Sequence, residues 1–293
     1  MHLVVGATGL LGSEICRRLS ATPQSVRALI RPTADKAKVE TLKRYGVELV
    51  QGDLKDRASL EAACRGAAAV ITTASSTFSR QAGDSIESVD QRGQLRLIAA
   101  AQATGVPRFI YISFSHQITV DCPLATAKRT VERQLQQSSL GYTILAPTFF
   151  MEVWLSPALG FDPASGKVQI YGSGANPISW ISFGDVAQFA IACLDDPAAR
   201  SATIELGGPE ALSPLEVVSR FEGVGGRKLA VTHVPEDVLR AQYAAATDPL
   251  QRSFAALTIA YTHGDPIDMG ATLRRFPVSL LSVNEYARRT VKP

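Results

Sequence analysis

The 293-residue sequence has little of several features that would assign a protein to a class at once. Its cysteines (Cys16, Cys64, Cys122 and Cys193) are scattered, without a CxxC pair or histidines at ligand spacing, which argues against a disulfide framework and against a metal site. No apolar run is long enough to span a bilayer, and no cationic segment precedes an apolar one at the N-terminus. We therefore expect a cytoplasmic protein with no membrane partner and no metal.

The sequence also lacks an excess of charge of either sign. Thirty Lys and Arg residues face 27 Asp and Glu residues, for a formal net charge of +3. Basic residues do not cluster among aromatic ones, so nucleic-acid binding has little support. Hydrophobic residues make up 46% of the chain and charged residues 19%, which is typical of a well-packed globular protein.

The N-terminal segment carries the strongest signal for function. Residues 2–5 are apolar and run directly into Gly-x-x-Gly-x-x-Gly, formed by Gly6, Gly9 and Gly12. We expect Gly6 to allow a tight turn, Gly9 to let backbone approach a pyrophosphate, and Gly12 to let a helix pack closely. Because a strand, a turn and an apolar helical face follow in order, the spacing predicts dinucleotide binding rather than an ordinary glycine-rich turn.

Strand and helix patterns alternate through the first half of the chain. Apolar runs at 2–5, 25–30, 47–51, 68–72, 108–113 and 142–146 alternate with helical patterns at 10–19, 34–45, 57–64, 85–104 and 124–137. Such alternation requires right-handed crossovers and a parallel sheet with helices on both faces. The predicted fold class is α/β, with a doubly wound parallel sheet of the Rossmann type.

The pattern changes after Pro147. Glycine, proline and serine become denser and the strands become short, although a helix near 185–195 and a strand at 203–206 suggest a return to the main sheet. We predict a dinucleotide-binding domain over residues 1–150. Residues 151–293 are expected to return partly to that sheet and to form a smaller C-terminal α+β lobe, which covers the substrate.

The end of the second strand indicates which dinucleotide is bound. An NAD site usually offers a carboxylate about 20 residues after the glycines, but Arg31 stands there instead. A guanidinium can bind a 2′-phosphate in a bidentate manner, so NADP(H) is the predicted cofactor, unless Arg31 is only a solvated cation at a strand end. Asp53, after the third strand, suits the adenine edge, or else caps the next helix.

Several segments together resemble the NmrA-like branch of the atypical short-chain dehydrogenases. They are residues 6–12 (GATGLLG), Arg31, 52–54 (GDL), 108–113 (RFIYIS), 147–152 (PTFFME) and 204–210 (IELGGPE). The resemblance covers nearly the whole chain and weakens after about Leu239. It implies a Rossmann domain, NADP(H) binding, and either a reductase or a catalytically silent redox sensor.

One position departs from the usual pattern of that superfamily. Short-chain dehydrogenases normally pair a tyrosine with a lysine four residues later, and the lysine lowers the pKa of the phenol. Here Lys128 is present but Leu124 stands in place of the tyrosine. This departure argues against ordinary interconversion of alcohols and ketones.

Lys128 also stands out on its own helix. Leu124, Ala127 and Val131 form an apolar stripe that includes Lys128, whereas Arg129 and Arg133 fall on the opposite face of the helical wheel. An inward ammonium is costly without a partner. It is either paired with Glu132, one turn later, or placed near the nicotinamide as a catalytic acid or base, as the lysine of isoflavone-reductase-like relatives implies.

Further candidates follow the later strands. Ser115 resembles the catalytic Ser/Thr of extended relatives but equally fits an ordinary loop residue, and its neighbour His116 is a weaker candidate for a proton donor. The predicted catalytic residues are thus Lys128 and Ser115. The predicted cofactor-binding residues are Gly6, Thr8, Gly9, Leu10, Leu11, Gly12, Arg31, Asp53, Leu54, Thr73, Ala74, Ser75, Lys128, Pro147, Thr148 and Phe149.

Two functions fit this sequence. The first is an NADPH-dependent reductase of a small apolar electrophile, such as a quinone, an enone or an aromatic carbonyl. The second is a catalytically silent NADP-binding regulator that senses redox state, which the missing tyrosine favours. A small-molecule substrate is expected in the first case, and the sequence leaves open whether the protein is a monomer or a homodimer.

Overall fold

The computed structural model describes residues 1–78 and 81–291, which form two compact units. The first unit comprises Met1–Ser113, Pro123–Leu145 and Val186–Ile204. The second comprises Phe114–Cys122, Ala146–Asp185 and the chain from Glu205 onward. The predicted functional division into residues 1–150 and 151–293 stays a prediction.

The first unit is built on a seven-stranded sheet in the order β3-β2-β1-β4-β5-β6-β9. Neighbouring strands from β3 to β6 pair in parallel, for example Leu3 with Arg27 and with Val70. The strands are β1 (His2–Val5), β2 (Val26–Ile30), β3 (Glu48–Gln51), β4 (Ala69–Thr72), β5 (Arg108–Ile112), β6 (Gly141–Pro147) and β9 (Ala202–Leu206). Since β1 lies between β2 and β4, the strand order changes direction between β1 and β4.

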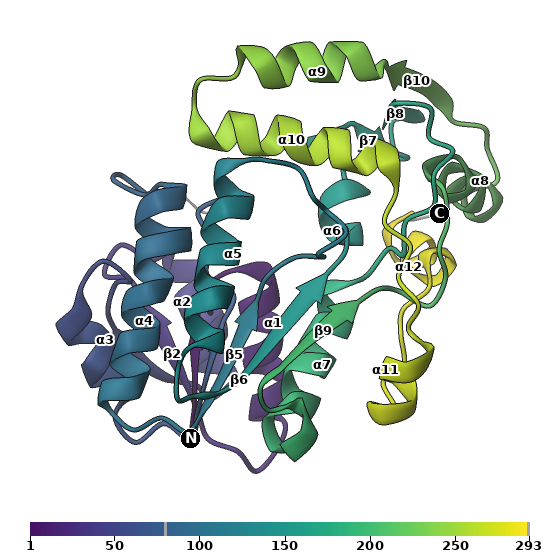
Figure 1. Cartoon of the computed structure of the whole chain (residues 1–293). Coiled ribbons are helices and arrows are strands. Elements are labelled where there is room, and N and C mark those ends of the chain that lie inside the picture. The colour runs from purple at the N-terminus through teal and green to yellow at the C-terminus, as the bar shows by residue number, and fades with distance from the viewer. Residues whose placement is uncertain (79–80, 292–293) are drawn as a thin grey trace. The chain divides into compact units, whose positions relative to one another are not determined.

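Helices cover both faces of this sheet. On one face α4 packs against α3 and α5, and on the other α1 packs against α2; α4 and α5 are the near helices in Figure 1. The helices are α1 (Leu10–Ser20), α2 (Lys36–Arg44), α3 (Arg57–Cys64), α4 (Arg92–Ala103), α5 (Pro123–Gln136) and α7 (Phe183–Asp195), with short helical turns η1 (Ile86–Gln91) and η3 (Pro197–Ala199). The predicted doubly wound α/β fold is confirmed.

The central strands are apolar because both of their faces are covered. Every residue of β1, β4 and β5 is buried, as expected for strands of a parallel sheet between two helical layers. Phe109 and Leu97 are among the largest fully buried side chains and belong to the core that α3, α4 and α5 close over. The apolar runs in the sequence therefore identified these strands correctly.

The segment predicted as one helix over 85–104 is divided in the structure. Ser85 caps a π-helical turn, η1, and α4 begins only at Arg92. The wider turn carries Asp90, which is buried and accepts hydrogen bonds from the Ser76 nitrogen (3.0 Å) and hydroxyl (2.6 Å). Hydrophobic periodicity does not reveal such a turn, although π-turns occur often at functional sites.

The second unit has a small sheet of its own in the order β10-β8-β7. Its strands are β7 (Phe161–Asp162), β8 (Lys167–Tyr171) and β10 (Ala230–Val234); β10 is parallel to β8 and β7 is antiparallel to it. Its helices are α6 (Met151–Trp154), η2 (Pro157–Leu159), α8 (Pro214–Gly225), α9 (Glu236–Ala245), α10 (Pro249–His263), α11 (Gly270–Arg275) and α12 (Val283–Thr290). Helices α9 and α10 pack against each other (Figure 1).

An aromatic core stabilises this second unit. The ring of Phe149 lies edge-on to Trp154, with 4.9 Å between centroids, and also edge-on to Tyr261 at 5.9 Å. Trp180 is fully buried and its indole nitrogen donates to the Leu212 oxygen at 2.8 Å.

None of the helices among the described residues combines the length and the apolar character needed to cross a membrane.

Candidate functional site

Two glycines shape the turn between β1 and α1. Gly6 has a φ of +86°, a conformation that side chains rarely adopt, and a Cβ there would lie 2.7 Å from the Ala74 nitrogen. A Cβ on Gly12 would lie 2.2 Å from the Gly6 oxygen. The fold itself therefore requires both glycines.

Gly9 is a different case within the same motif. A Cβ there would meet only the Gly6 oxygen, at 3.2 Å, so the fold demands glycine less strictly. Gly9 is also the N-cap of α1 and provides no side chain to hydrogen-bond the first turn. The N–H groups of Leu10, Leu11 and Gly12 begin this helix, and such uncapped N–H groups bind phosphate well. The helix start therefore fits the pyrophosphate of a dinucleotide.

A pocket lies at the carboxyl ends of the strands, where their order changes direction between β1 and β4. The structure brings many of the predicted cofactor-binding residues together here. Those that line the pocket are Gly6, Thr8, Gly9, Arg31, Asp53, Leu54, Thr73, Ala74 and Ser75. Val5, Leu29, Gly52, Asp84 and Val89 complete the lining.

The pocket wall after β4 is held by a residue that sequence reasoning missed. Gln94 of α4 is buried, its amide nitrogen donates to the Ala74 oxygen at 2.9 Å, and its amide oxygen accepts from the Thr72 hydroxyl at 3.1 Å. The Thr73 nitrogen donates to the Val5 oxygen at 2.9 Å, which ties the same segment to β1. A glutamine on the buried face of an apolar helix was the available signal.

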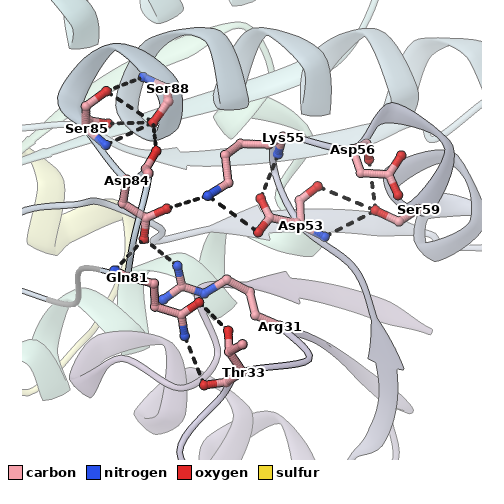
Figure 2. Close-up of polar contacts among 11 residues, drawn as sticks. Arg31, Thr33, Asp53, Lys55, Asp56, Ser59, Gln81, Asp84, Ser85 and Ser88 are labelled. Carbon is pink, nitrogen blue, oxygen red and sulfur yellow. Dashed lines mark hydrogen bonds and ion pairs between the residues drawn. The ribbon is translucent and has the colours of Figure 1, made fainter.

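Asp53 belongs to the pocket and does not cap the next helix. Its carboxylate accepts from the Lys55 nitrogen at 2.8 Å, whereas Asp56 is the N-cap of α3 and accepts from the Ala58 nitrogen at 3.0 Å. Figure 2 shows both carboxylates and Ser59 between them. Of the two interpretations of Asp53, the structure is compatible with the adenine-edge position and not with helix capping.

Arg31 is not a solvated cation, because it forms an ion pair with a residue far away in the sequence. Its Nη1 lies 2.5 Å from one carboxylate oxygen of Asp84, and the Lys55 Nζ lies 2.8 Å from the other (Figure 2). Burial alone would raise the pKa of Asp84, but hydrogen bonds from Lys55, the Gln81 nitrogen and Arg31 hold that pKa below its usual range. The Arg31–Lys55–Asp84 cluster is thus charged and preorganised.

Lys128 lies on α5 against strand β5. Its Nζ donates to the Ile112 oxygen at 3.1 Å and lies 5.3 Å from the centre of the Tyr111 ring. Desolvation lowers the pKa of Lys128, although the charges of Asp90 and Glu132 partly oppose that shift. A lysine in this setting can release its proton more easily than an exposed one.

The structure does not pair Lys128 with Glu132 as the alternative interpretation proposed. The Glu132 carboxylate instead lies 2.6 Å from the Arg129 Nη1 and accepts a hydrogen bond from the Ser113 hydroxyl. Arg129 therefore reaches inward, rather than standing on the solvent face as the helical wheel suggested. The long arginine side chain explains the difference, because it can bend back one turn along α5.

Ser115 and the residues after β6 belong to the second unit. Ser115 is fully buried, its hydroxyl donates to the Asp265 carboxylate at 2.9 Å, and its nitrogen donates to the Pro147 oxygen at 2.9 Å. Burial raises the pKa of Asp265, and the hydrogen bond from Ser115 only partly offsets this. Thr148 is buried, and Phe149 belongs to the aromatic core.

His116 and the cysteines have other surroundings. The His116 ring nitrogen Nδ1 contacts the Glu205 carboxylate, and about 40% of the histidine side chain is exposed. All four cysteines are buried. Within residues 1–78 and 81–291, no three His, Cys, Asp or Glu side chains are placed to hold a metal ion.

Two known proteins are similar to this chain in sequence. Photosystem II assembly factor Ycf39 of Synechocystis sp. is 31% identical over 242 residues, which cover 81% of this chain and 72% of that protein. A NAD(P)H azoreductase of Xenophilus azovorans is 31% identical over 231 residues, 78% of this chain and 74% of that protein.

Solved structures share the fold, and a family model matches the sequence. The NADPH-dependent quinone oxidoreductase of Escherichia coli, solved with NADPH, has a TM-score of 0.79 at 23% identity, over 99% of each chain. The cofactor of that structure is the one that the sequence predicts here. Residues 2–273 match the model of the NmrA-like family. The chain is therefore a member of the NmrA-like family.

Proposed function

We propose that this protein is an NADPH-dependent reductase of a small apolar electrophile, such as a quinone, an enone or an aromatic carbonyl. The relatives support a general oxidoreductase, because an azoreductase is similar in sequence and a quinone oxidoreductase shares the fold. The observation that carries the proposal is Lys128, a lysine whose ammonium is desolvated and whose pKa is lowered. Such a group is suited to giving a proton to a reduced substrate.

The pocket residues provide the binding part of this function. The glycine turn and the start of α1 would hold the pyrophosphate, and Asp53 with Leu54 would hold the adenosine. Arg31 would bind the 2′-phosphate, and Thr73, Ala74 and Ser75 would line the dinucleotide along β4. When bound, NADPH supplies the hydride; the protein binds, orients and provides the proton.

Lys128 would be the proton donor. Its ammonium is positioned by the Ile112 oxygen and the Tyr111 ring, and the lowered pKa brings proton loss closer to neutral pH. The proton of Nζ would move to the oxygen of the substrate, and solvent would then restore it. This role does not require the tyrosine that Leu124 replaces.

The phenol of Tyr111 is a poor substitute for the missing tyrosine. Tyr111 lies beside Lys128, but its side chain is buried and its pKa is raised well above the usual value by desolvation. Ser115 is buried as well and its hydroxyl is bound to Asp265, so we assign it a structural role in preference to a catalytic one. Pro147, Thr148 and Phe149 remain proposed contacts of the nicotinamide.

A catalytically silent NADP-binding sensor is the second candidate. Leu124 is buried at the position of the usual tyrosine, and a similar protein is named as an assembly factor. In both candidates we propose that the protein works in the cytoplasm, because scattered, buried cysteines are typical of a reducing compartment.

Consumption of NADPH with a panel of quinones and enals separates the two candidates. The reductase is expected to oxidise NADPH with at least one of them, and Lys128→Met is expected to slow this by roughly 10²–10⁴-fold. Arg133→Met, an exposed basic residue of the same helix, is the matched control and should leave the rate unchanged. Tight NADPH binding without oxidation by any member of the panel would support the sensor instead.

A further inference from the structure

Asp84 is an acidic side chain buried inside a pocket that is expected to bind a phosphate. Only 1% of its side chain is exposed, and it lines the same pocket as Gly9 and Asp53. One carboxylate oxygen accepts from the Arg31 Nη1 at 2.5 Å and from the Gln81 nitrogen at 2.9 Å. The other accepts from the Lys55 Nζ at 2.8 Å (Figure 2).

The two cations around Asp84 come from neighbouring strands. Arg31 directly follows β2 and Lys55 lies shortly after β3, so both stand at the carboxyl edge of the sheet. Guanidinium and ammonium groups that converge on one carboxylate have the same donor chemistry as a site for a phosphate monoester. The Asp84 carboxylate therefore binds the same two donors, Arg31 and Lys55, that a 2′-phosphate would need.

The charges show why Asp84 and a 2′-phosphate cannot both bind Arg31 and Lys55 without a cost in free energy. Arg31 and Lys55 contribute two positive charges, while Asp84 and Asp53, whose carboxylate lies 3.8 Å from the Lys55 Nζ, contribute two negative ones. A phosphate dianion that reached Arg31 would meet the Asp84 carboxylate at close range. Like charges in a partly buried site repel strongly, so the phosphate must displace Asp84 or share its cations.

We infer that Asp84 is a specificity-determining residue, an internal anion that competes with the 2′-phosphate of NADP(H) for Arg31 and Lys55. Asp84 weakens binding of the phosphorylated cofactor and leaves NAD(H) almost unaffected, because NAD(H) has no 2′-phosphate. It also keeps the two cations from repelling each other in the ligand-free protein. The inference rests on the proposed binding of NADP(H) in this pocket, and not on any catalytic activity.

Calorimetric titration of Asp84→Asn tests the inference without turnover. The probes are 2′,5′-ADP and 5′-AMP, which differ only by the 2′-phosphate, followed by NADPH and NADH. Asparagine keeps the size and the acceptor for the Gln81 nitrogen but removes the charge. We expect 2′,5′-ADP and NADPH to bind the variant roughly tenfold more tightly than they bind the wild type, and the affinities of 5′-AMP and NADH to change less than about twofold.

The matched control is Asp56→Asn. Asp56 is the N-cap of α3 and lies in the same view, yet it makes no ion pair with Arg31 or Lys55 among the described contacts. Asparagine caps helices as well as aspartate does, so this variant removes one nearby charge without removing a competitor. It should leave the ratio of the 2′,5′-ADP and 5′-AMP affinities within about twofold of the wild type.

Two further measurements keep the inference falsifiable if Asp84→Asn is unstable. Without ligand, this variant should melt at a lower temperature than the wild type, and 2′,5′-ADP should raise its melting temperature by more than that of the wild type. In an Arg31→Ala background, the gain from Asp84→Asn should shrink, because one of the two contested cations is gone.

Three results would overturn the inference, and a fourth would overturn the proposed cofactor site on which it rests. If Asp84→Asn binds 2′,5′-ADP no more tightly than the wild type, Asp84 does not compete with the phosphate. If it weakens the binding of 5′-AMP and NADH, Asp84 instead binds the ribose hydroxyls. If the gain persists fully in the Arg31→Ala background and also after Lys55→Met, the effect does not act through these cations. If even the wild type binds neither nucleotide, the proposed cofactor site itself is wrong.

Discussion

Two lysines of the first unit have opposite electrostatic settings. Lys55 lies within 3.8 Å of Asp53 and within 2.8 Å of Asp84, and about a third of its side chain is exposed. Lys128 has a backbone oxygen and an aromatic ring beside its ammonium, and its pKa is lowered by desolvation. A cation held by carboxylates can recognise an anion, whereas a desolvated one can give up its proton. The same residue type thus suits binding in one region and chemistry in the other.

A substitution in the glycine turn should give the largest effect, because the binding region around Lys55 and the chemical region around Lys128 both require a bound dinucleotide. Gly9→Val places a side chain where backbone must approach the pyrophosphate, and we expect calorimetry to detect no NADPH binding. Circular dichroism should stay close to that of the wild type, since a Cβ on Gly9 meets only one atom, at 3.2 Å. Gly223→Val, where a Cβ meets nothing within 4 Å, is the control. Thermal stabilisation of Gly9→Val by NADPH would place the phosphates elsewhere.

Removal of Arg31 should weaken the binding of NADPH and leave the chemical region around Lys128 unchanged. Arg31→Ala loses one charge-assisted contact to the 2′-phosphate, which we expect to cost about 1.5–3 kcal/mol of NADPH binding, or roughly 10- to 150-fold in Kd. NADH should bind nearly as it does to the wild type. Equal affinities of the wild-type protein for NADPH and NADH would contradict the role of Arg31.

The role proposed for Lys128 predicts that the turnover rate depends on pH. If Lys128 acts as an acid, turnover is full below its pKa and falls as the pH rises through that pKa, by about tenfold per pH unit. Because desolvation lowers the pKa of Lys128, the fall should begin below the value of about 10.4 that is usual for lysine. The Kd of NADPH should stay flat over the same range. A turnover rate independent of pH would remove Lys128 from the reaction.

The smallest effect is expected in the second unit, at Asp265. Burial raises the pKa of Asp265, so stability falls as the pH rises from the usual aspartate pKa to that raised pKa, and above it the folded protein carries an unfavourable charge. Asp265→Asn keeps an acceptor for the Ser115 hydroxyl and should raise Tm by about 2–4 °C near pH 8, with a smaller gain at acidic pH. Scanning calorimetry at the two pH values measures this. A loss of Tm at both would indicate that the charge itself stabilises the unit.

Local patterns predicted the fold well. The buried strands β1, β4 and β5 are mostly apolar, and the glycine spacing predicts the β1–α1 turn. Arg31 could be singled out because the distance from the glycines to the end of the second strand is characteristic of this fold. Such features depend on neighbouring residues in the sequence, so the sequence alone was enough for them.

Long-range contacts could not be predicted in the same way. Asp84 contacts Arg31 across 53 positions of sequence, and Gln94 reaches Ala74 across 20. Nothing in the local pattern around Asp84 distinguishes it from a solvated loop residue. The helical wheel likewise placed Arg129 outward, because it ignores the reach of a long side chain toward Glu132.

The division between binding and chemistry can be measured directly in two variants. Turnover at saturating NADPH and the Kd of NADPH are determined for Lys128→Met and Arg31→Ala with the same electrophile. We expect Lys128→Met to keep the Kd within a few-fold and to lose roughly 10²–10⁴-fold in turnover, whereas Arg31→Ala weakens the Kd and keeps most of the turnover. If Lys128→Met retains the turnover of the wild type, Lys128 is not the proton donor and the proposed mechanism is wrong.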